Sequence, residues 1–164
     1  MDEATGEIVA VTLTTNQVCD GEVLPDLLAQ VETPIIQLTG DGSYDQRQCY
    51  EALQEYQAAQ GQPLRVVIPP QRGAALWHKA GEPKSAQRDA NLKRMGEIGR
   101  RRWKRETGYY RQSKVENTVY RYKTLLGGKL GARDFERQKR ETIIGCIALN
   151  RMAALGMPDS YIVS

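Results

Sequence analysis

The chain has 164 residues, 40% of them hydrophobic and 26% charged, which is the composition of a globular domain and not of a disordered segment. No apolar run approaches the roughly 20 residues that cross a bilayer. The N-terminus lacks the basic start and apolar core of a signal peptide. Three cysteines and one histidine are too few and too widely spaced for a disulfide framework or a zinc site. Together these features predict one reduced, cytoplasmic domain over residues 1–164.

The net charge of +3 is unevenly distributed along the chain. Residues 1–60 carry eleven acidic side chains and one basic one, whereas residues 61–164 carry nine acidic and 22 basic ones. A basic half of this kind favours a polyanionic partner, with nucleic acid the leading candidate. A solvated helix surface would have the same composition, so charge alone leaves both interpretations open. Acids beside a phosphate-binding surface are also what a divalent-metal nuclease needs.

The first 40 residues predict two strands separated by a helix. Residues 7–15, EIVAVTLTT, alternate apolar and polar side chains and are rich in β-branched types, which is typical of a strand. Leucines and valine at helical spacing predict a helix over 22–32, with Pro25 near its start. The apolar run PIIQLTG at 34–40 predicts the second strand.

A helix and a third strand are predicted next. The segment YDQRQCYEALQEYQAAQ has helical character, and Gly61 is placed to end it. Asp45 with Gln48 three residues later fits a capping box, so Asp45 is predicted to cap this helix. The run LRVVIPP at 64–70 predicts a strand that its two prolines stop. Strands alternating with helices indicate βαβ units and a partly parallel sheet, an α/β fold.

The rest of the chain is predicted to be largely helical. Residues 71–87 are polar and contain glycines and a proline, which predicts an exposed loop. Basic helices are predicted over 86–106 and 111–126. The last helix, 134–155, is apolar on most sides, so we expect it to be buried against the sheet, with Gly156 ending it.

Asp41 is the first candidate site residue. It directly follows the predicted strand 34–40, at the end of the sheet where α/β proteins bind ligands. A carboxylate there suits a divalent metal ion, but an aspartate that only shapes the turn would occupy the same position. The choice depends on which other residues could share the metal.

A second set of candidates lies in the predicted helix 111–126. Apolar residues at helical spacing form a predicted core stripe of Val115, Val119, Tyr122 and Leu126. Glu116 lies at the rim of that stripe, and Lys123 follows two turns later in nearly the same direction. Tyr109 and Gln112 precede Glu116 on the same side if the helix extends back to them. A surface helix with no task would have the same periodicity.

The spacing of Tyr109, Gln112, Glu116 and Lys123 resembles the tyrosine, arginine, glutamate, lysine motif of DDE transposases of bacterial insertion sequences. The likeness is closest to the insertion sequence five group, with its insertion sequence four-like transposase domain. This chain has glutamine where the motif has arginine, although Arg111 is adjacent. The turn GDGSYD resembles the family's second aspartate segment. Further stretches, among them VIPPQRGA and ALNRMAALGMPDSY, extend the likeness over essentially the whole chain.

This resemblance implies a ribonuclease-H-like mixed sheet flanked by helices, and cutting and joining of DNA strands. Three carboxylates in such enzymes hold two divalent ions, Mg²⁺ or Mn²⁺. The resemblance assigns Asp41 as the second acid and Glu116 as the third, both catalytic and metal-binding. The resemblance and the basic segment together predict which residues bind DNA. These residues are Lys123, Tyr109, Gln112, Arg111, Arg101, Arg102, Lys104 and Arg105.

The family's first aspartate has no counterpart in this sequence. The segment DEATGE corresponds to the turn that leads into the family's third strand, so the resemblance implies a C-terminal portion without the N-terminal strands. We expect that this chain alone does not transpose DNA. One hypothesis is the catalytic portion of a split or truncated transposase that acts on terminal inverted repeats at the bacterial nucleoid. The alternative is a non-catalytic DNA-binding or inhibitory fragment that pairs with another copy or with an intact transposase.

Overall fold

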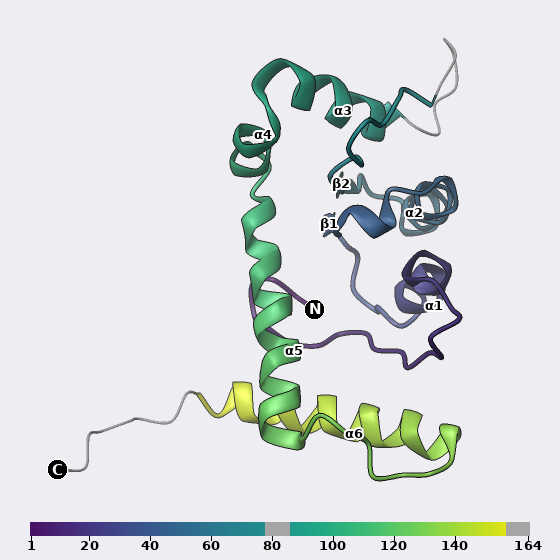
Figure 1. Ribbon diagram of the computed structural model, residues 1–164, viewed down its shortest axis with the longest axis vertical. Helices are drawn as coiled ribbons and strands as arrows, with labels where there is room; N and C mark the ends of the chain where they lie inside the picture. Colours follow the sequence, from purple (N-terminus) through teal and green to yellow (C-terminus); the bar gives the residue numbers. More distant parts are fainter. Residues whose placement is uncertain (78–85, 157–164) are drawn as a thin grey trace, which may run out of the picture. The chain divides into compact units, whose positions relative to one another are not determined.

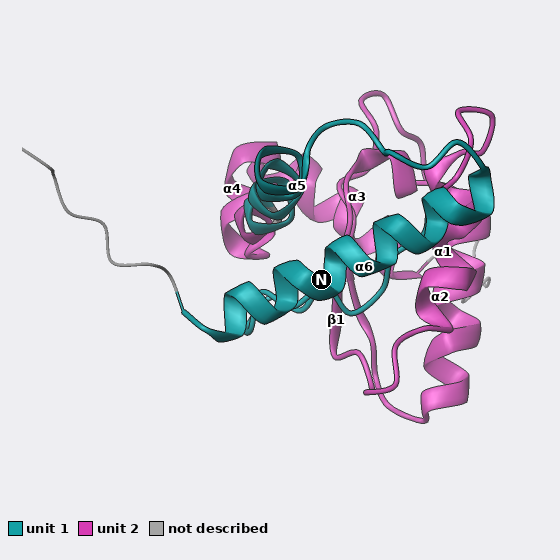
Figure 2. Cartoon of the chain, turned by 90° about the horizontal axis from the view of Figure 1, so that it is seen from below, with its two compact units in different colours: residues 1–13, 113–164 teal, residues 14–112 magenta. Residues whose placement is uncertain are grey.

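The computed structural model describes residues 1–77 and 86–156, which belong to two compact units. Unit 2 is the continuous segment 14–112, whereas unit 1 combines residues 1–13 with residues 113–164 (Figure 2). Much of the predicted loop 71–87, His78 included, lies outside the described residues.

Unit 2 contains two short parallel strands, β1 (Gln37–Thr39) and β2 (Arg65–Val67). Helix α2 (Arg47–Gln60) connects them and lies beside them (Figure 1), which is the βαβ unit that the sequence predicts. Gly61 ends α2 in the left-handed conformation, with φ 68°, as predicted. The strands are shorter than the predicted runs 34–40 and 64–70 but fall inside them.

The main core of unit 2 lies where α2 packs on the short helices that precede β1. These are the 3-10 turn η1 (Asp20–Val23) and α1 (Leu24–Leu28), which together stop before the predicted end of helix 22–32. The buried core residues are Leu24, Leu28, Cys49, Tyr50, Leu53, Leu64, Val66 and Ile68. Burying these apolar side chains is the main stabilising contribution in this part of the chain.

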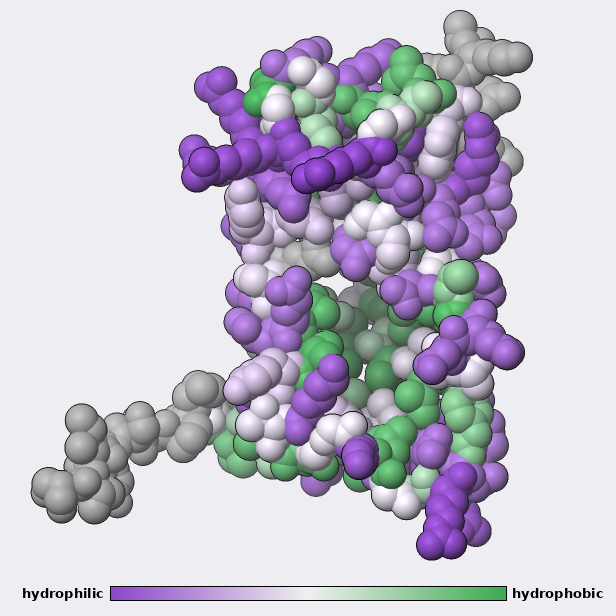
Figure 3. All heavy atoms as spheres, in the orientation of Figure 1, coloured by the Kyte–Doolittle hydropathy of each residue, from purple (hydrophilic) through white to green (hydrophobic). Residues whose placement is uncertain are grey.

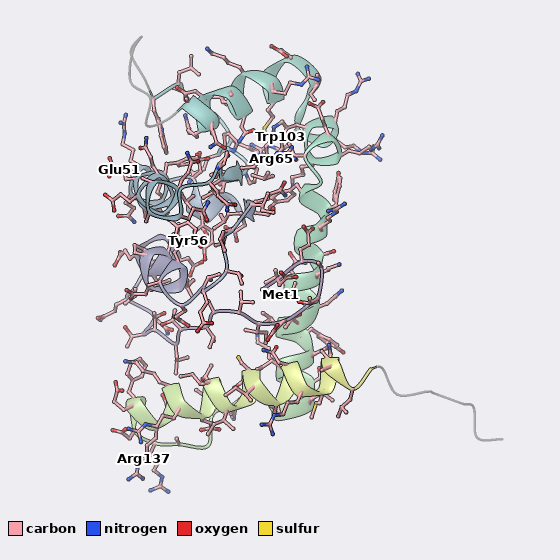
Figure 4. All side chains as sticks on the ribbon, turned by 180° about the vertical axis from the view of Figure 1, so that it is seen from behind. Met1, Glu51, Tyr56, Arg65, Trp103 and Arg137 are labelled. Carbon is pink, nitrogen blue, oxygen red and sulfur yellow. The ribbon has the colours of Figure 1, made fainter. Side chains whose placement is uncertain are left out.

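A second core in unit 2 forms where two helices meet β2. The predicted helix 86–106 is in fact two helices, α3 (Ala86–Ile98) and α4 (Arg100–Glu106). Gly99 breaks it with a φ of 78°, a conformation that glycine adopts at no steric cost. Trp103 of α4 is fully buried and packs with Val67 and Met95 (Figure 4).

Unit 1 contains the helices α5 (Ser113–Leu126) and α6 (Phe135–Ala154) and the N-terminal segment. The two helices are in close contact at Gly145, where a Cβ atom would lie 2.7 Å from a ring carbon of Tyr122. The prediction that residues 7–15 form a strand is wrong. These residues are not part of a sheet. The backbone of Ile8 pairs with the Asn150 side-chain amide and not with a neighbouring strand: its N–H donates to Asn150 Oδ1 at 2.9 Å, and its carbonyl accepts from Asn150 Nδ2 at 3.0 Å.

Two packing predictions for unit 1 are also wrong. In the predicted core stripe of α5, Tyr122 is half-buried, but Val115, Val119 and Leu126 are exposed. Helix α6 was expected to be buried, yet it buries only Gly145, Cys146 and Leu149. Its residues Ile143, Ile144 and Ile147 are exposed, and Figure 3 shows hydrophobic residues at the surface there. Periodicity therefore located these helices correctly but overestimated how much of each is covered.

The described parts form a mixed α/β structure that is mostly helical and has a small two-stranded parallel sheet. The predicted α/β class is confirmed at this level. None of the helices in residues 1–77 and 86–156 is long and apolar enough to cross a bilayer.

Candidate active site and nucleic-acid surface

Asp41 follows β1 after one residue, Gly40. It is the N-cap of the 3-10 turn η2 (Gly42–Tyr44). Its Oδ1 accepts hydrogen bonds from the Ser43 backbone N–H, at 2.7 Å, and from Ser43 Oγ, at 2.5 Å. Both bonds hold one carboxylate oxygen, which fixes the side chain. Within the described part of the chain, Oδ2 takes no hydrogen bond, and the residue is exposed. Asp41 therefore caps a turn and still presents an oxygen to solvent.

Acidic groups gather around this turn. The Ser43 hydroxyl lies 3.5 Å from Asp20 Oδ2, a much longer contact than the one to Asp41. Burial raises the pKa of Tyr44, and the negative charges of Asp20 and Asp41 raise it further. Tyr44 therefore stays protonated beside two carboxylates at neutral pH.

Asp45 is not the cap of α2, so that prediction is wrong. The N-cap position is Gln46, which makes no side-chain cap hydrogen bond. Asp45 is buried, and its two oxygens pair with Arg88 Nε, at 2.9 Å, and Arg88 Nη2, at 3.3 Å. Both carboxylate oxygens of Asp45 are thus engaged by groups outside α2 and not by the N–H groups of its first turn.

The Asp45–Arg88 pair belongs to a larger buried network that the sequence did not predict. Arg88 Nη1 also donates to Asp89 Oδ1, at 3.2 Å, and to the Ala75 carbonyl, and its guanidinium carbon lies 3.9 Å from the Trp77 ring centroid. The Gln71 N–H donates to Asp45 Oδ2 at 2.9 Å. Because Asp45, Gln71 and Arg88 are far apart in the chain, no local sequence pattern predicts the network.

Glu116 and Lys123 both lie on α5 in unit 1, and both side chains are exposed. Glu116 is in the first turn of α5, where a carboxylate interacts favourably with the helix dipole. Asp41 lies in unit 2, so the two acids assigned to the active site belong to different units. Their pairing stays a prediction.

Tyr109 and Gln112 were predicted to lie on the same side as Glu116 if the helix extended back to them. The helix that carries Glu116 does not extend back to Tyr109. Residues Tyr109–Gln112 form the 3-10 turn η4, and α5 begins at Ser113. The Tyr109 ring lies 6.3 Å from the Trp103 ring and beneath Lys104, whose Nζ is 4.5 Å from its centroid. Tyr109 and Lys104 thus contribute to the packing of α4, beside any role with DNA.

The basic residues around α4 divide into two groups. Some are engaged by the protein: Arg100 donates to the Pro70 carbonyl, and Arg94 forms a bidentate pair with Glu106, both contacts at 2.9 Å. Arg101, Arg102 and Arg105 are exposed, and Figure 3 shows long hydrophilic side chains projecting where α4 lies. These three are the basic residues of α4 whose side chains are exposed.

The donor chemistry of Asp41 and Glu116 fits a hard divalent ion, which prefers carboxylate oxygens. Asp41 is the better fit of the two, because the residue is exposed and Ser43 holds only one of its carboxylate oxygens, Oδ1. No group of three or more potential metal ligands occurs within residues 1–77 and 86–156. The residues that fit are therefore two separate carboxylates.

The model of the transposase DDE domain family matches residues 1–151, and no solved structure matches the chain. The chain belongs to this transposase family, which associates it with nuclease chemistry and transposition. Enzymes of the family generally use divalent metal ions and act on DNA. The predicted family is confirmed.

Proposed function

We propose that the chain is the C-terminal portion of the catalytic domain of an insertion-sequence transposase of the insertion sequence five group, with a ribonuclease-H-like fold. The observation that carries this proposal is the position of the exposed Asp41 one residue after β1 of a parallel pair, with its Oδ1 held by Ser43. Asp41 and Glu116 would hold two ions together with an aspartate that this sequence lacks. Bound divalent ions would activate the attacking oxygen and stabilise the leaving oxygen of the DNA backbone.

The chain's own residues would bind and orient the DNA. Arg101, Arg102 and Arg105 contact phosphates from one short helix, and phosphate contacts fix register without reading sequence. Lys123 lies two turns along α5 from Glu116 and would hold a phosphate near the reacting bond. Tyr109, Gln112 and Arg111 in η4 would position the DNA end.

A gel-shift assay tests the DNA surface. The probe is a duplex that carries the terminal inverted repeat of the encoding element, and the variant replaces Arg101, Arg102 and Arg105 with Ala. We expect weaker binding at every salt concentration and a salt-dependence slope reduced by about 3, one unit for each lost phosphate contact.

The matched control replaces Arg133, Arg137 and Arg140 with Ala, which removes the same charge from the exposed surface near and on α6. If both triple variants bind equally weakly, binding follows net charge and α4 is not a dedicated surface.

The second candidate is a non-catalytic fragment that binds DNA and pairs with an intact transposase. The lack of a counterpart to the family's first aspartate in this sequence favours it. Incubation of the purified chain with Mg²⁺ and the same duplex tests whether the chain is catalytic on its own. We expect no nicking by the chain alone. Nicking that disappears in Asp41→Ala would refute this expectation and favour a self-sufficient enzyme.

A further inference from the structure

We infer that Asp45 and Arg88 are positioning residues for Asp41, and that their buried ion pair fixes the turn that presents Asp41 to a divalent cation. The inference rests on the proposed function, because it takes Asp41 as a metal ligand. It adds the groups that hold this ligand in place, neither of which contacts the ion.

The backbone between Asp41 and Asp45 connects the ion pair to the proposed ligand. Asp41 and Asp45 are the two ends of η2, and the Asp45 N–H donates to the Gly42 carbonyl at 3.2 Å. The Tyr44 N–H donates to the Asp41 carbonyl at 3.3 Å. Since the turn is this short and internally bonded, a shift of Asp45 moves the backbone of Asp41.

The segment after β2 holds the same turn from a second side. The Gln71 N–H donates to Asp45 Oδ2 at 2.9 Å, and Gln71 Nε2 lies 3.5 Å from the Gly42 carbonyl. Asp45 therefore joins the ends of both strands, because β1 leads into Asp41 and β2 leads into Gln71. In parallel sheets this end of the strands is where ligands bind.

Arg88 makes the connection rigid. Its side chain comes from α3, and its guanidinium uses Nε and Nη2 for Asp45 and Nη1 for Asp89 and the Ala75 carbonyl. One face of the group lies on the Trp77 ring at 3.9 Å. A planar group fixed by bidentate bonds and by stacking has little freedom to rotate.

The positive charge of Arg88 is a second reason, besides its hydrogen-bond geometry, why the turn depends on this residue. Asp45 and Asp89 are both buried, and Arg88 lies between them as their shared cation. Loss of Arg88 would remove the cation that pairs with the buried Asp45 carboxylate, so the turn would have to open to hydrate that group. Partners that orient a metal-binding carboxylate typically change metal affinity by about 10-fold to 100-fold.

The test is a Mn²⁺ titration of the ¹⁵N-labelled chain, followed by paramagnetic broadening of the Gly42 and Ser43 amide signals. The variants are Asp45→Asn and Arg88→Lys. The matched control is Arg94→Lys, on the same helix, whose partners Glu97 and Glu106 are exposed and do not touch the turn. We expect half-broadening to need about 10-fold more Mn²⁺ in the two variants and an unchanged concentration in the control.

An unchanged midpoint in Asp45→Asn and Arg88→Lys, with native-like spectra, would overturn the inference. Asp41→Asn tests the proposed function separately, because it should abolish the selective broadening of these two amides. If Asp41→Asn changes nothing, the metal-ligand role of Asp41 fails, whatever the other variants do.

A measurement on the unmodified chain covers the case in which neither variant folds. In a Mg²⁺ titration, the Gln71 amide and the Arg88 Nε–H signals should shift with the same midpoint as the Ser43 amide, since the network joins them. Shifts confined to residues 41–44 would show that the network does not respond to the ion, and the inference would be wrong.

Discussion

Asp41 and Asp45 lie four residues apart and have opposite environments. Asp41 is exposed and caps a 3-10 turn, whereas Asp45 is buried against an arginine. The position of Asp41 could be predicted, because a strand followed by a glycine-rich turn is a local signal. The role of Asp45 could not be predicted, because its partner Arg88 lies 43 residues further along the chain.

The Asp45–Arg88 pair also predicts a large effect on stability. We expect Arg88→Ala to lower the free energy of unfolding by about 3–5 kcal/mol, because it leaves the Asp45 carboxylate buried without the cation that pairs with it. Urea denaturation followed by circular dichroism measures this change.

The exposed pair on the same helix provides the comparison. Arg94→Ala breaks contacts with Glu97 and Glu106 that lie at the surface, so we expect a much smaller loss than for Arg88→Ala. Equal losses in the two variants would mean that burial of the Arg88 network adds no stability.

At the level of the helices, the sequence predicts where each helix lies in the chain better than it predicts how much of its surface is buried. Periodicity located α2, α5 and α6, and Gly61 ends α2 as expected. The strand predicted at 7–15 failed for a different reason. A strand requires a neighbour that supplies a hydrogen-bond ladder, and alternation of side chains contains no information about whether that neighbour exists.

The contact between α5 and α6 predicts that a side chain at Gly145 forces Tyr122 to move. A methyl group there would lie 2.7 Å from a Tyr122 ring carbon and 2.8 Å from its hydroxyl. We expect Gly145→Ala to destabilise unit 1 by about 1–3 kcal/mol through overpacking, measured by thermal denaturation.

Gly96 is the matched control for this substitution. It lies inside α3, and no heavy atom comes within 4 Å of its Cβ position. Gly96→Ala should therefore stabilise the chain by about 0.5–1 kcal/mol, since alanine has the higher helix propensity. Destabilisation of similar size at both positions would contradict the assignment of Gly145 to a close helix contact.

Glu141 on α6 makes the fold of unit 1 sensitive to acid. Its carboxylate accepts hydrogen bonds from the backbone N–H groups of Gly131 and Ala132, both at 2.8 Å, and these bonds hold its pKa below the usual value of 4.5. A lowered pKa in the folded state means that the stabilisation is present above pH 4.5 and is lost as the pH falls through the folded value.

We therefore expect Glu141→Gln to lower the Tm at pH 7 and to have progressively less effect as the pH falls below 4.5. Thermal scans from pH 3 to pH 8 measure this. Glu136→Gln removes the same charge from the first turn of α6 and serves as the control. A Tm difference for Glu141→Gln that grows towards low pH would contradict the assignment.

At the scale of the whole molecule, the two candidate acids belong to different units, so an ion that binds both would couple those units. We expect Asp41→Asn and Glu116→Gln each to weaken Mn²⁺ binding. The double variant should bind little more weakly than either single variant, because the shared ion is lost only once. Electron paramagnetic resonance of free Mn²⁺ measures the affinities.

A control cycle pairs Asp41→Asn with Glu136→Gln, two acids for which no shared role is proposed. Their effects on Mn²⁺ affinity should add independently. If the Asp41 and Glu116 effects are also additive, the two residues do not share an ion.

The division into units also determines the order in which the chain can fold during synthesis. Unit 2 is one uninterrupted stretch, so its contacts are available as soon as residue 112 has left the ribosome. Unit 1 has to wait, because Ile8 hydrogen-bonds to Asn150, 142 residues later. Residues 1–13 are thus made well before the part of the chain that they contact. Until then, a β-branched apolar segment stays accessible to chaperones.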